Sequence, residues 1–423
     1  MERRRFLQAG AIASAGAITG CATVAMPAKP HVVVIGGGYG GATAAKHVRM
    51  WSGGDIDVTL IEPNATFISC PLSNLVLGGS KSISDLTLSY AGLAREHGVR
   101  ILRDSAVGIN SAKRAVILSG GSMVLYDRLI VSPGIEFLWN ELPGMMSSMA
   151  QDKVLHAWKA GAQTIALRAQ LDAMRDGGTY ALTIPPAPYR CPPGPYERAC
   201  QVAFYFSKHK PKSKVLVLDA NEDVVSKGAL FKRIWRERYG SIIEYRPSFR
   251  TVDVHAASNT AVSELDDKVQ ADVLNVIPPH RAGAIAAQTG LAKTGQRWCE
   301  VDFRTFESTQ AKNIHVIGDA ILAAPLMPKS AHMANQHAKV CAAAVVDLLS
   351  GREPEAKPML TNTCYSFVSD KDVIHVASVH AYNEEKKTLL AVSGSGGLSD
   401  SASELEGVYA MNWARNIWAD SLA

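Results

Sequence analysis

The sequence lacks several features that would assign it to a class at once. Beyond residue 25 it has no run of about 18 apolar residues, the length that a membrane-spanning helix needs. It has no Cys-x-x-Cys-His motif, so it attaches no c-type haem itself, and no cysteine and histidine spacing typical of a zinc site. No internal repeat is visible. We therefore expect a soluble or peripherally held protein without a metal site.

An excess of charge of one sign is also missing. The chain has 44 Lys and Arg against 39 Asp and Glu, a net charge of +5, and removal of residues 1–25 takes away three Arg and one Glu and leaves +3. This balance gives no reason to expect a nucleic-acid partner. At 423 residues the chain is too long for one hydrophobic core, so two or three domains are expected.

The N-terminus predicts export. Arg3-Arg4-Arg5-Phe6-Leu7 and the Ala/Gly-rich run to Gly20 match a twin-arginine signal, and the apolar stretch is too short for a membrane helix. This route carries folded proteins, which suits a chain that loads a cofactor before crossing. Cleavage after Ala25 is expected, although Ile18-Thr19-Gly20-Cys21 also resembles a lipoprotein signal that would leave Cys21 lipidated. In an oxidising periplasm, pairs of the other six cysteines can persist as disulfides.

The stretch from His31 to Glu62 predicts a dinucleotide site. An apolar strand, Val32 to Ile35, ends in Gly36-x-Gly38-x-x-Gly41, and a helix from Ala42 to Arg49 comes next. Gly36 allows a tight turn, Gly38 allows close approach of a pyrophosphate, and Gly41 allows the helix to pack on the strand. The strand from Asp57 places Glu62 where a carboxylate can accept hydrogen bonds from an adenosine ribose.

The next segments extend this first domain. Cys70 and Pro71 lie in a loop that comes after the ribose-binding strand and can reach a flavin ring. Tyr126 to Gly134 reads as a strand that ends in a turn. In flavoproteins with two dinucleotide-binding domains such a turn marks the crossing to the second domain, so we predict a boundary near Ile135.

A second glycine fingerprint is absent where it is expected. The strand Thr179–Ile184 leads into a proline-rich loop from Pro185 to Pro193 that contains Cys191. Proline has a fixed φ and no N–H, so this loop cannot form the amide cradle that an NAD pyrophosphate needs. The helix 196–208 and the strand 214–219 continue the βαβ pattern. We expect a second Rossmann-like domain over 136–268 that lacks an NAD site.

The chain is expected to return to the first domain at Val269, with strands at 273–277 and 298–303. The strand that ends in Gly318-Asp319 resembles the second half of an FAD signature, in which the carboxylate faces the ribityl hydroxyls. The helix 330–349 would direct its positive end at the flavin. The first domain is therefore discontinuous, 31–135 and 269–350.

A third segment, 351–423, contains Asn362-Thr363-Cys364, further strands, a Gly/Ser-rich loop and a C-terminal end with Trp413 and Trp418. The tryptophans read first as packing residues. The last forty residues contain Glu, Lys, Ser and Gly and show little of the amphipathic apolar surface that a membrane-bound enzyme would need.

Several of these motifs together resemble one known family, the flavoprotein subunit of flavocytochrome c sulfide dehydrogenase, within the wider sulfide:quinone oxidoreductase group. The resemblance covers nearly the whole chain after the signal. The motifs that carry it are Gly36–Gly41, Ser69–Asn74, Tyr189–Arg198, Gly318-Asp319, Thr363–Tyr365 and Asn416–Asp420.

The resemblance implies an α/β fold with two dinucleotide-binding (Rossmann-like) domains of the glutathione reductase type and a C-terminal α+β domain. It implies FAD bonded through the sulfur of Cys70, and a redox disulfide between Cys191 and Cys364 beside the ring. It also implies that electrons leave through a separate c-type cytochrome subunit, in a heterodimer.

The chemistry of the residues agrees with oxidation of sulfide. A disulfide sulfur is the easiest two-electron acceptor for a thiol-like nucleophile, and attack leaves a persulfide on one cysteine and a thiolate on the other. The product would be zero-valent sulfur or polysulfide. Glu197, at the start of the next helix, is placed to shuttle a proton, or alternatively only complements the helix dipole.

Alternatives stay open at this point. A sulfide:quinone oxidoreductase would pass electrons to a membrane quinone, and a non-catalytic FAD-binding subunit would serve only to dock a cytochrome. An NAD(P)H-dependent reductase is disfavoured by the proline loop. Cys200, nine residues after Cys191, competes with Cys364 as disulfide partner, whereas Cys299 and Cys341 read as buried thiols. Which cysteine sulfide attacks is open, with Cys191 preferred.

Overall fold

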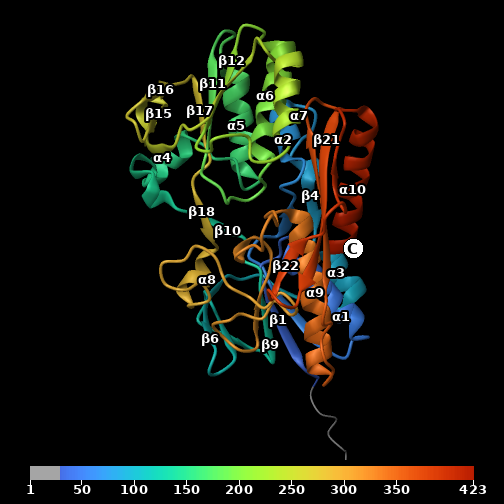
Figure 1. Cartoon of the computed structure of the whole chain (residues 1–423). Coiled ribbons are helices and arrows are strands. Elements are labelled where there is room, and N and C mark those ends of the chain that lie inside the picture. The colour runs from blue at the N-terminus through green and yellow to red at the C-terminus, as the bar shows by residue number, and fades with distance from the viewer. Residues whose placement is uncertain (1–28) are drawn as a thin grey trace, which may run out of the picture.

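The structure is a computed structural model and describes residues 29–423. The predicted export signal at 1–25, with cleavage after Ala25 or lipidation at Cys21, lies outside the described residues and stays a prediction. The described chain forms two α/β parts, one above the other, and a C-terminal part that runs along one side of both (Figure 1). The expected α/β fold class is confirmed.

The first part is built on a five-stranded parallel sheet in the order β19-β9-β1-β2-β5. Its central strand β1 contains Val32, Val33 and Val34, which are fully buried because helices and loops cover both faces of the sheet. The predicted order of strand, turn, helix and strand is confirmed, although the helix α1 begins at Tyr39 and therefore includes Gly41. The elements of this part are β1 (His31–Ile35), α1 (Tyr39–Trp51), β2 (Asp57–Ile61), β3 (Thr66–Ile68), α2 (Ser73–Gly78), β4 (Thr87–Ser89), α3 (Ala91–His97), β5 (Arg100–Leu102), β6 (Ala106–Asn110), β7 (Ala115–Leu118), β8 (Met123–Leu125), β9 (Arg128–Val131), α8 (Ala284–Gln288), β19 (Ile314–Val316) and α9 (Ala331–Leu349).

The second part repeats this plan in a four-stranded parallel sheet, in the order β13-β12-β11-β17. Two short antiparallel strands, β10 (Ile135–Phe137) and β18 (His280–Ala282), connect it to the first part. Its elements are α4 (Ser148–Lys153), α5 (Ala162–Ala173), β11 (Thr179–Ile184), α6 (Gly194–His209), β12 (Lys214–Asp219), α7 (Gly228–Arg238), β13 (Ile243–Arg246), β14 (Thr251–His255), β15 (Thr260–Ser263), β16 (Lys268–Gln270) and β17 (Val273–Val276).

The C-terminal part is an antiparallel sheet of β20 (Met359–Phe367), β21 (Val373–Asn383), β22 (Thr388–Ala391) and β23 (Gly397–Leu398), with α10 (Glu404–Leu422) after it. Helix α10 packs on the first part, where the hydroxyl groups of Thr43 and Ser421 lie 2.9 Å apart. The sheet also contacts the second part, because the side chain of Gln201 donates to the carbonyl of Phe367 at 3.0 Å. The C-terminal part therefore holds the two α/β parts together from one side.

Two sequence predictions about the segment after residue 268 are wrong. The chain does not return to the first sheet at Val269, because β17 pairs in parallel with β11 and extends the second sheet. An isolated bridge between Leu155 and Asn275 also ties β17 to the second part. The predicted strand at 298–303 is reduced to isolated bridges at Cys299 and Val301. Propensity cannot tell which of two similar sheets a buried apolar strand will join.

The prediction of a C-terminal end with little apolar surface also needs correction. On α10, Leu405, Val408 and Tyr409 expose about half of their surface or more, and Leu398 on β23 is similarly exposed. Residues separated by three and four positions share one face of a helix, so the exposed side of α10 is partly apolar. In the described part of the chain, no helix combines the length and the apolarity that crossing a membrane requires.

Candidate functional site

One cavity of about 570 Å³ lies where the three parts of the molecule meet. The sequence predicts ten candidate site residues, and all of them except Gly41 line this cavity. The nine lining residues are Gly36, Gly38, Glu62, Cys70, Cys191, Glu197, Gly318, Asp319 and Cys364. They come from segments that are far apart in the chain, so the fold gathers them into one site.

The glycine turn is built as the sequence predicts. Gly36 has φ +92°, and a Cβ there would lie 2.4 Å from the carbonyl oxygen of Ser132. A Cβ on Gly41 would lie 1.8 Å from the carbonyl oxygen of Gly36, so only glycine allows α1 to pack this closely on the turn. A Cβ on Gly38 would meet no atom within 4 Å and would enter the cavity. This open position fits a pyrophosphate at the start of α1.

Glu62 is buried and held at the end of β2. Its carboxylate accepts hydrogen bonds from the backbone N–H of Gly37 at 2.7 Å and from the backbone N–H of Asn64 at 2.8 Å. Each carboxylate oxygen has further lone pairs, so Glu62 can still accept from ribose hydroxyls. The residue is thus both a brace for the glycine turn and a candidate contact to a nucleotide.

Asp319 is the strongest sign that the cavity takes a polar ligand. Its Oδ1 is buried and has no hydrogen-bond donor among the described residues. Burial raises the pKa of this carboxyl, against the lowering influence of Arg190 and Lys329. A buried carboxylate oxygen without a donor is costly, whereas the hydroxyls of a ribityl chain would satisfy it. Together with the glycine turn, this oxygen shows that the residues present fit FAD.

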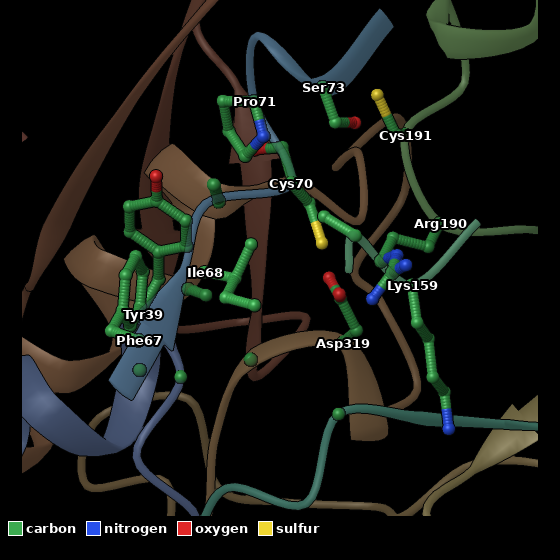
Figure 2. A pocket seen from close by; sticks show the side chains of 18 of the residues that line it. Tyr39, Phe67, Ile68, Cys70, Pro71, Ser73, Lys159, Arg190, Cys191 and Asp319 are labelled. Carbon is green, nitrogen blue, oxygen red and sulfur yellow. The ribbon is translucent and has the colours of Figure 1, made fainter. Parts of the chain in front are cut away.

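Cys70 lies in the loop after β3. Figure 2 shows its sulfur directed into the cavity, on the side where Asp319 and Arg190 lie. Leu72, at the start of α2, has φ +72°, so the Cys70-Pro71 turn is sharp and puts Cys70 at the cavity wall. Covalent attachment of a cofactor at Cys70 is not tested by this geometry and stays a prediction.

Cys191 is held in an unusual backbone conformation. Its φ is +58°, in the left-handed region, and its N–H donates to the carbonyl of Lys329 at 2.8 Å. The prolines and this hydrogen bond fix the loop between β11 and α6. Left-handed backbone conformations at residues other than glycine are often found at functional sites. Burial and the neighbouring Cys364 raise the pKa of Cys191.

Cys364 reaches the same cavity from β20. Asn362, two residues earlier on the same face of the strand, has its amide nitrogen 3.7 Å from the sulfur of Cys364. Burial raises the pKa of Cys364, against the lowering influence of Lys227, Asn362 and Ser330. Both Cys191 and Cys364 are free thiols in the structure, so the predicted disulfide is not formed there and stays a prediction.

The competing partner, Cys200, lies away from the cavity. It is fully buried in α6, and the indole N–H of Trp235 donates to its sulfur at 3.3 Å. Cys299 and Cys341 are fully buried as well, which confirms their interpretation as buried thiols. The cavity itself is lined by Cys70, Cys191 and Cys364 and by none of these three buried thiols.

Glu197 is a buried carboxylate at the beginning of α6. One of its oxygens accepts from the backbone N–H of Phe367 at 2.9 Å, and the other accepts from the side chain of Asn74 at 3.0 Å. Burial raises the pKa of Glu197. The side chain lines the cavity, and its hydrogen bonds join all three parts of the molecule. Its role as a proton shuttle stays a prediction.

Lys227 does not line the cavity but contacts the lining residue Cys364, and the sequence does not predict this contact. It lies just before α7 and reaches the C-terminal sheet, where its ammonium donates to the carbonyl of Cys364 at 3.0 Å and to the hydroxyl of Ser366 at 2.7 Å. Burial lowers the pKa of Lys227 to about 8. A single lysine before a helix carries no sequence signal for such a role. Trp413 on α10, interpreted from the sequence first as a packing residue, also lines the cavity.

In the second βαβ unit the acidic residue that could contact an NAD ribose, Asp219, is not free to do so. Asp219 ends β12, at the place that corresponds to Glu62 after β2, but its Oδ2 accepts from the hydroxyls of Tyr196 at 2.7 Å and Tyr245 at 3.0 Å. Its Oδ1 accepts from the backbone and side chain of Asn221. The chain's own side chains therefore occupy this carboxylate. In the range 29–423, no group of three or more metal-ligating side chains comes together.

Comparisons with known proteins agree with this geometry. The family model described as "Sulfide dehydrogenase [flavocytochrome c] flavoprotein chain, central" matches residues 164–278, and the one described as "Flavocytochrome c sulphide dehydrogenase, flavin-binding" matches 356–422. The model of the pyridine nucleotide-disulphide oxidoreductases matches residues 30–173. The central match includes β17, which ends at Val276.

Individual relatives come from the same group. The sulfide dehydrogenase [flavocytochrome c] flavoprotein chain of Chlorobaculum thiosulfatiphilum is 53% identical over 46 residues, which is 11% of this chain and 94% of that sequence. The mitochondrial sulfide:quinone oxidoreductase of Mus musculus is 26% identical over 305 residues, 69% of this chain and 66% of that protein, so the chain spans just under two thirds of its length. The structure of the sulfide:quinone oxidoreductase from Aquifex aeolicus matches with a TM-score of 0.74 at 17% identity, over 93% of this chain and 91% of that one.

Proposed function

Because this chain belongs to the flavoproteins related to flavocytochrome c sulfide dehydrogenase and sulfide:quinone oxidoreductase, we propose that it binds FAD and oxidises sulfide. The observation that carries the proposal is the cavity in which three features meet: a dinucleotide turn, the Oδ1 of Asp319, which has no donor among the described residues, and the pair Cys191 and Cys364. The product would be zero-valent sulfur or polysulfide.

The reactive group in this proposal is a disulfide between Cys191 and Cys364. Hydrosulfide attacks one sulfur, the S–S bond breaks, and the products are a persulfide on the attacked cysteine and a thiolate on the other. Glu197, with its raised pKa, takes up and returns the proton of the incoming hydrosulfide. When bound, FAD supplies the two-electron acceptor that allows the disulfide to form again.

The residues that would hold FAD are Gly36, Gly38 and Gly41 around the pyrophosphate, Glu62 at the ribose, and Gly318 with Asp319 at the ribityl chain. We propose in addition that FAD is bonded to the sulfur of Cys70, which points into the cavity. Acid denaturation tests this point directly. A flavin that precipitates with the protein supports the bond, and a flavin that stays in the supernatant contradicts it.

Substitution of single cysteines tests the redox pair. Cys191→Ser and Cys364→Ser should each abolish reduction of the flavin by sulfide in an anaerobic stopped-flow experiment, while the flavin stays bound. Cys200→Ser is the matched control, because its sulfur is buried and lies outside the cavity. Full reduction in Cys364→Ser, or a Cys191–Cys200 bridge in a peptide map made without reductant, would contradict the assignment.

We propose that the electron acceptor is a c-type cytochrome subunit, in a heterodimer located in the periplasm after export by the twin-arginine route. Support comes from the family models, which match the central and flavin-binding segments of flavocytochrome c flavoprotein chains. Purification of the native protein from periplasm with a haem-staining polypeptide is the expected result. Cytochrome c, but not a quinone analogue, should reoxidise the sulfide-reduced protein.

A quinone-linked enzyme is the second candidate, and one observation favours it. The exposed apolar side chains Leu405, Val408 and Tyr409 on α10 offer a surface that a membrane could cover. Two relatives that match over 302 and 305 residues are also sulfide:quinone oxidoreductases. A protein that turns over only with quinone in detergent would establish this candidate. If sulfide at any concentration fails to reduce the flavin, the remaining candidate is a non-catalytic docking subunit.

A further inference from the structure

The two cavity cysteines differ in their surroundings, and the difference originates from a lysine in the second part of the molecule. Lys227 is 5% exposed and has φ +56°. This left-handed conformation at the start of α7 turns its side chain away from the helix and toward β20 and β21. The ammonium is fixed there by three acceptors, the carbonyl of Cys364 at 3.0 Å, the hydroxyl of Ser366 at 2.7 Å and the carbonyl of Ile374 at 3.3 Å.

The geometry of β20 places this charge on the side of the strand that carries the Cys364 sulfur. Residues 362, 364 and 366 alternate with their neighbours and therefore share one face of the strand. Ser366 contacts the ammonium, and both the amide nitrogen and the amide oxygen of Asn362 lie 3.7 Å from the sulfur of Cys364, so the nitrogen can donate once the thiolate forms. Cys364 thus lies between a fixed cation and an N–H donor, both of which stabilise a thiolate.

Cys191 has no equivalent support. Among residues 29–423 no side chain donates a hydrogen bond to its sulfur. The carboxylate of Glu197 opposes a negative charge on Cys191 and on Cys364 alike, so it does not distinguish the two cysteines. Arg190 and Lys227 lower the pKa of Cys191, but their effects are smaller than those of burial, Cys364 and Glu197, which raise it. The two ends of the cysteine pair are therefore electrostatically unequal.

We propose that Lys227 sets the direction in which the disulfide opens: it stabilises Cys364 as the leaving thiolate, so that hydrosulfide attacks the sulfur of Cys191. The inference rests on the proposed sulfide chemistry and deepens it. In this step a bond forms between hydrosulfide and Cys191, and the Cys191–Cys364 bond breaks. Its electron pair stays on Cys364, and Cys191 becomes the persulfide. A thiolate of lower pKa leaves faster, so the asymmetry decides between the two possible attacks.

The positive charge of Lys227 depends on pH. Burial lowers the pKa of Lys227 to about 8, while the groups that face it, Cys364, Glu197, Cys191 and Glu406, all oppose that lowering. They belong to β20, α6, the proline loop and α10, whereas β21 contributes the carbonyl of Ile374. Lys227 acts through Cys364 and is a positioning residue, not a catalytic one.

Thiol reactivity provides a readout that does not depend on turnover. The reduced holoprotein is treated with iodoacetamide over a range of pH, and the modification of Cys364 is followed by peptide mass analysis. Lys227→Met should slow the alkylation of Cys364 about tenfold at neutral pH and move its pH midpoint up by about one unit, since one pKa unit is a tenfold change in thiolate. Because the same cysteine is compared between variants, differences in access cancel.

Two further variants separate the charge from the fold. Lys227→Arg keeps the charge and should retain most of the reactivity of Cys364. Lys232→Met removes an exposed lysine from the same helix, where it pairs with Asp223 at 2.7 Å, and should change nothing. Unchanged alkylation of Cys364 in Lys227→Met overturns the inference.

A second measurement uses only the unsubstituted protein. After anaerobic mixing with sulfide and rapid alkylation, the added sulfur should be found on the Cys191 peptide. Persulfide on Cys364 overturns the inference. If neither peptide carries the added sulfur while Lys227→Met still slows Cys364, the role of Lys227 in stabilising the thiolate stands and the proposed sulfide chemistry fails.

Discussion

The two βαβ units of this chain share a backbone plan and differ in the loop after their first strand. In the first unit β1 and β2 pair in parallel around a glycine turn, and in the second unit β11 and β12 pair in the same way around a proline loop. The glycine turn leaves room for a pyrophosphate at Gly38, whereas the proline loop brings Cys191 to the cavity. One scaffold can thus cradle a cofactor or position a reactive side chain, depending on a few residues in one turn.

The two units also differ in the acidic residue at the end of their second strand, Glu62 after β2 and Asp219 in β12. Glu62 accepts from the backbone of its own turn and still lines the cavity. Asp219 is occupied by Tyr196, Tyr245 and Asn221. In the second unit the acidic residue is therefore part of an internal hydrogen-bond network and is not open to a ligand.

Substitution of Gly41 should break the first unit and produce the largest effect. In Gly41→Ala the new Cβ would lie 1.8 Å from the carbonyl oxygen of Gly36, so the turn and α1 must separate. We expect a loss of about 3 kcal/mol in the free energy of unfolding and little bound flavin. Thermal unfolding and the flavin-to-protein absorbance ratio measure both.

Gly38→Ala is the matched control for this experiment. Its Cβ would meet no protein atom within 4 Å, so the fold should keep its stability while flavin content falls. Equal stability of Gly41→Ala and Gly38→Ala would contradict the close packing of α1 on the turn.

Lys227 should make the second unit sensitive to pH. Its pKa falls from 10.5 to about 8 on folding, so the folded state loses this proton first. Below about pH 8 Lys227 is charged in both the folded and the unfolded state, and the folded state bears the full cost of burying that charge. Between about pH 8 and 10.5 the unfolded state binds more protons than the folded state, so the free energy of unfolding rises with pH. Lys227→Met should remove about 3 kcal/mol of this rise, measured by urea unfolding at each pH. Lys232→Met should keep it.

Neutral substitutions of the two acidic residues should separate their roles. In a Cys70→Ser background, where no thioether can form, Glu62→Gln should weaken FAD binding by about 1.5 kcal/mol, since a hydrogen bond to a charged group is lost. Asp219→Asn should leave FAD binding unchanged and lower only the stability. Titration calorimetry with FAD is the measurement, and an equal loss of affinity in both variants would contradict the different roles of the two carboxylates.

The smallest effect is expected for Tyr196→Phe. This change removes the hydrogen bond to Asp219 and also the weaker one that the hydroxyl accepts from the backbone N–H of Val225 at 3.2 Å. Asp219 keeps the hydroxyl of Tyr245 and the groups of Asn221. We expect a loss of about 1 kcal/mol in stability and no change in flavin content. Chemical denaturation resolves such a difference. Binding of NADH gained by this variant would show that Tyr196 alone had closed the second site.

The features that depend on neighbouring residues could be predicted from the sequence alone. The glycine turn, the acid at Glu62, the strand that ends in Gly318-Asp319 and the proline loop around Cys191 all result from local backbone rules, because φ restrictions and strand periodicity act over a few residues. Nine of the ten predicted site residues therefore line one cavity, while their roles stay predictions.

The contacts that join distant segments became known only from the packed chain. There β17 belongs to the second sheet, α10 exposes apolar side chains, and the ammonium of Lys227 reaches Cys364, 137 positions later in the chain. None of these has a local signature, because the choice between sheets depends on total buried area and a lysine's partners depend on the segments that fold around it. Burial and charge pairing are properties of the whole folded chain, whereas turns and periodicities belong to short stretches of sequence.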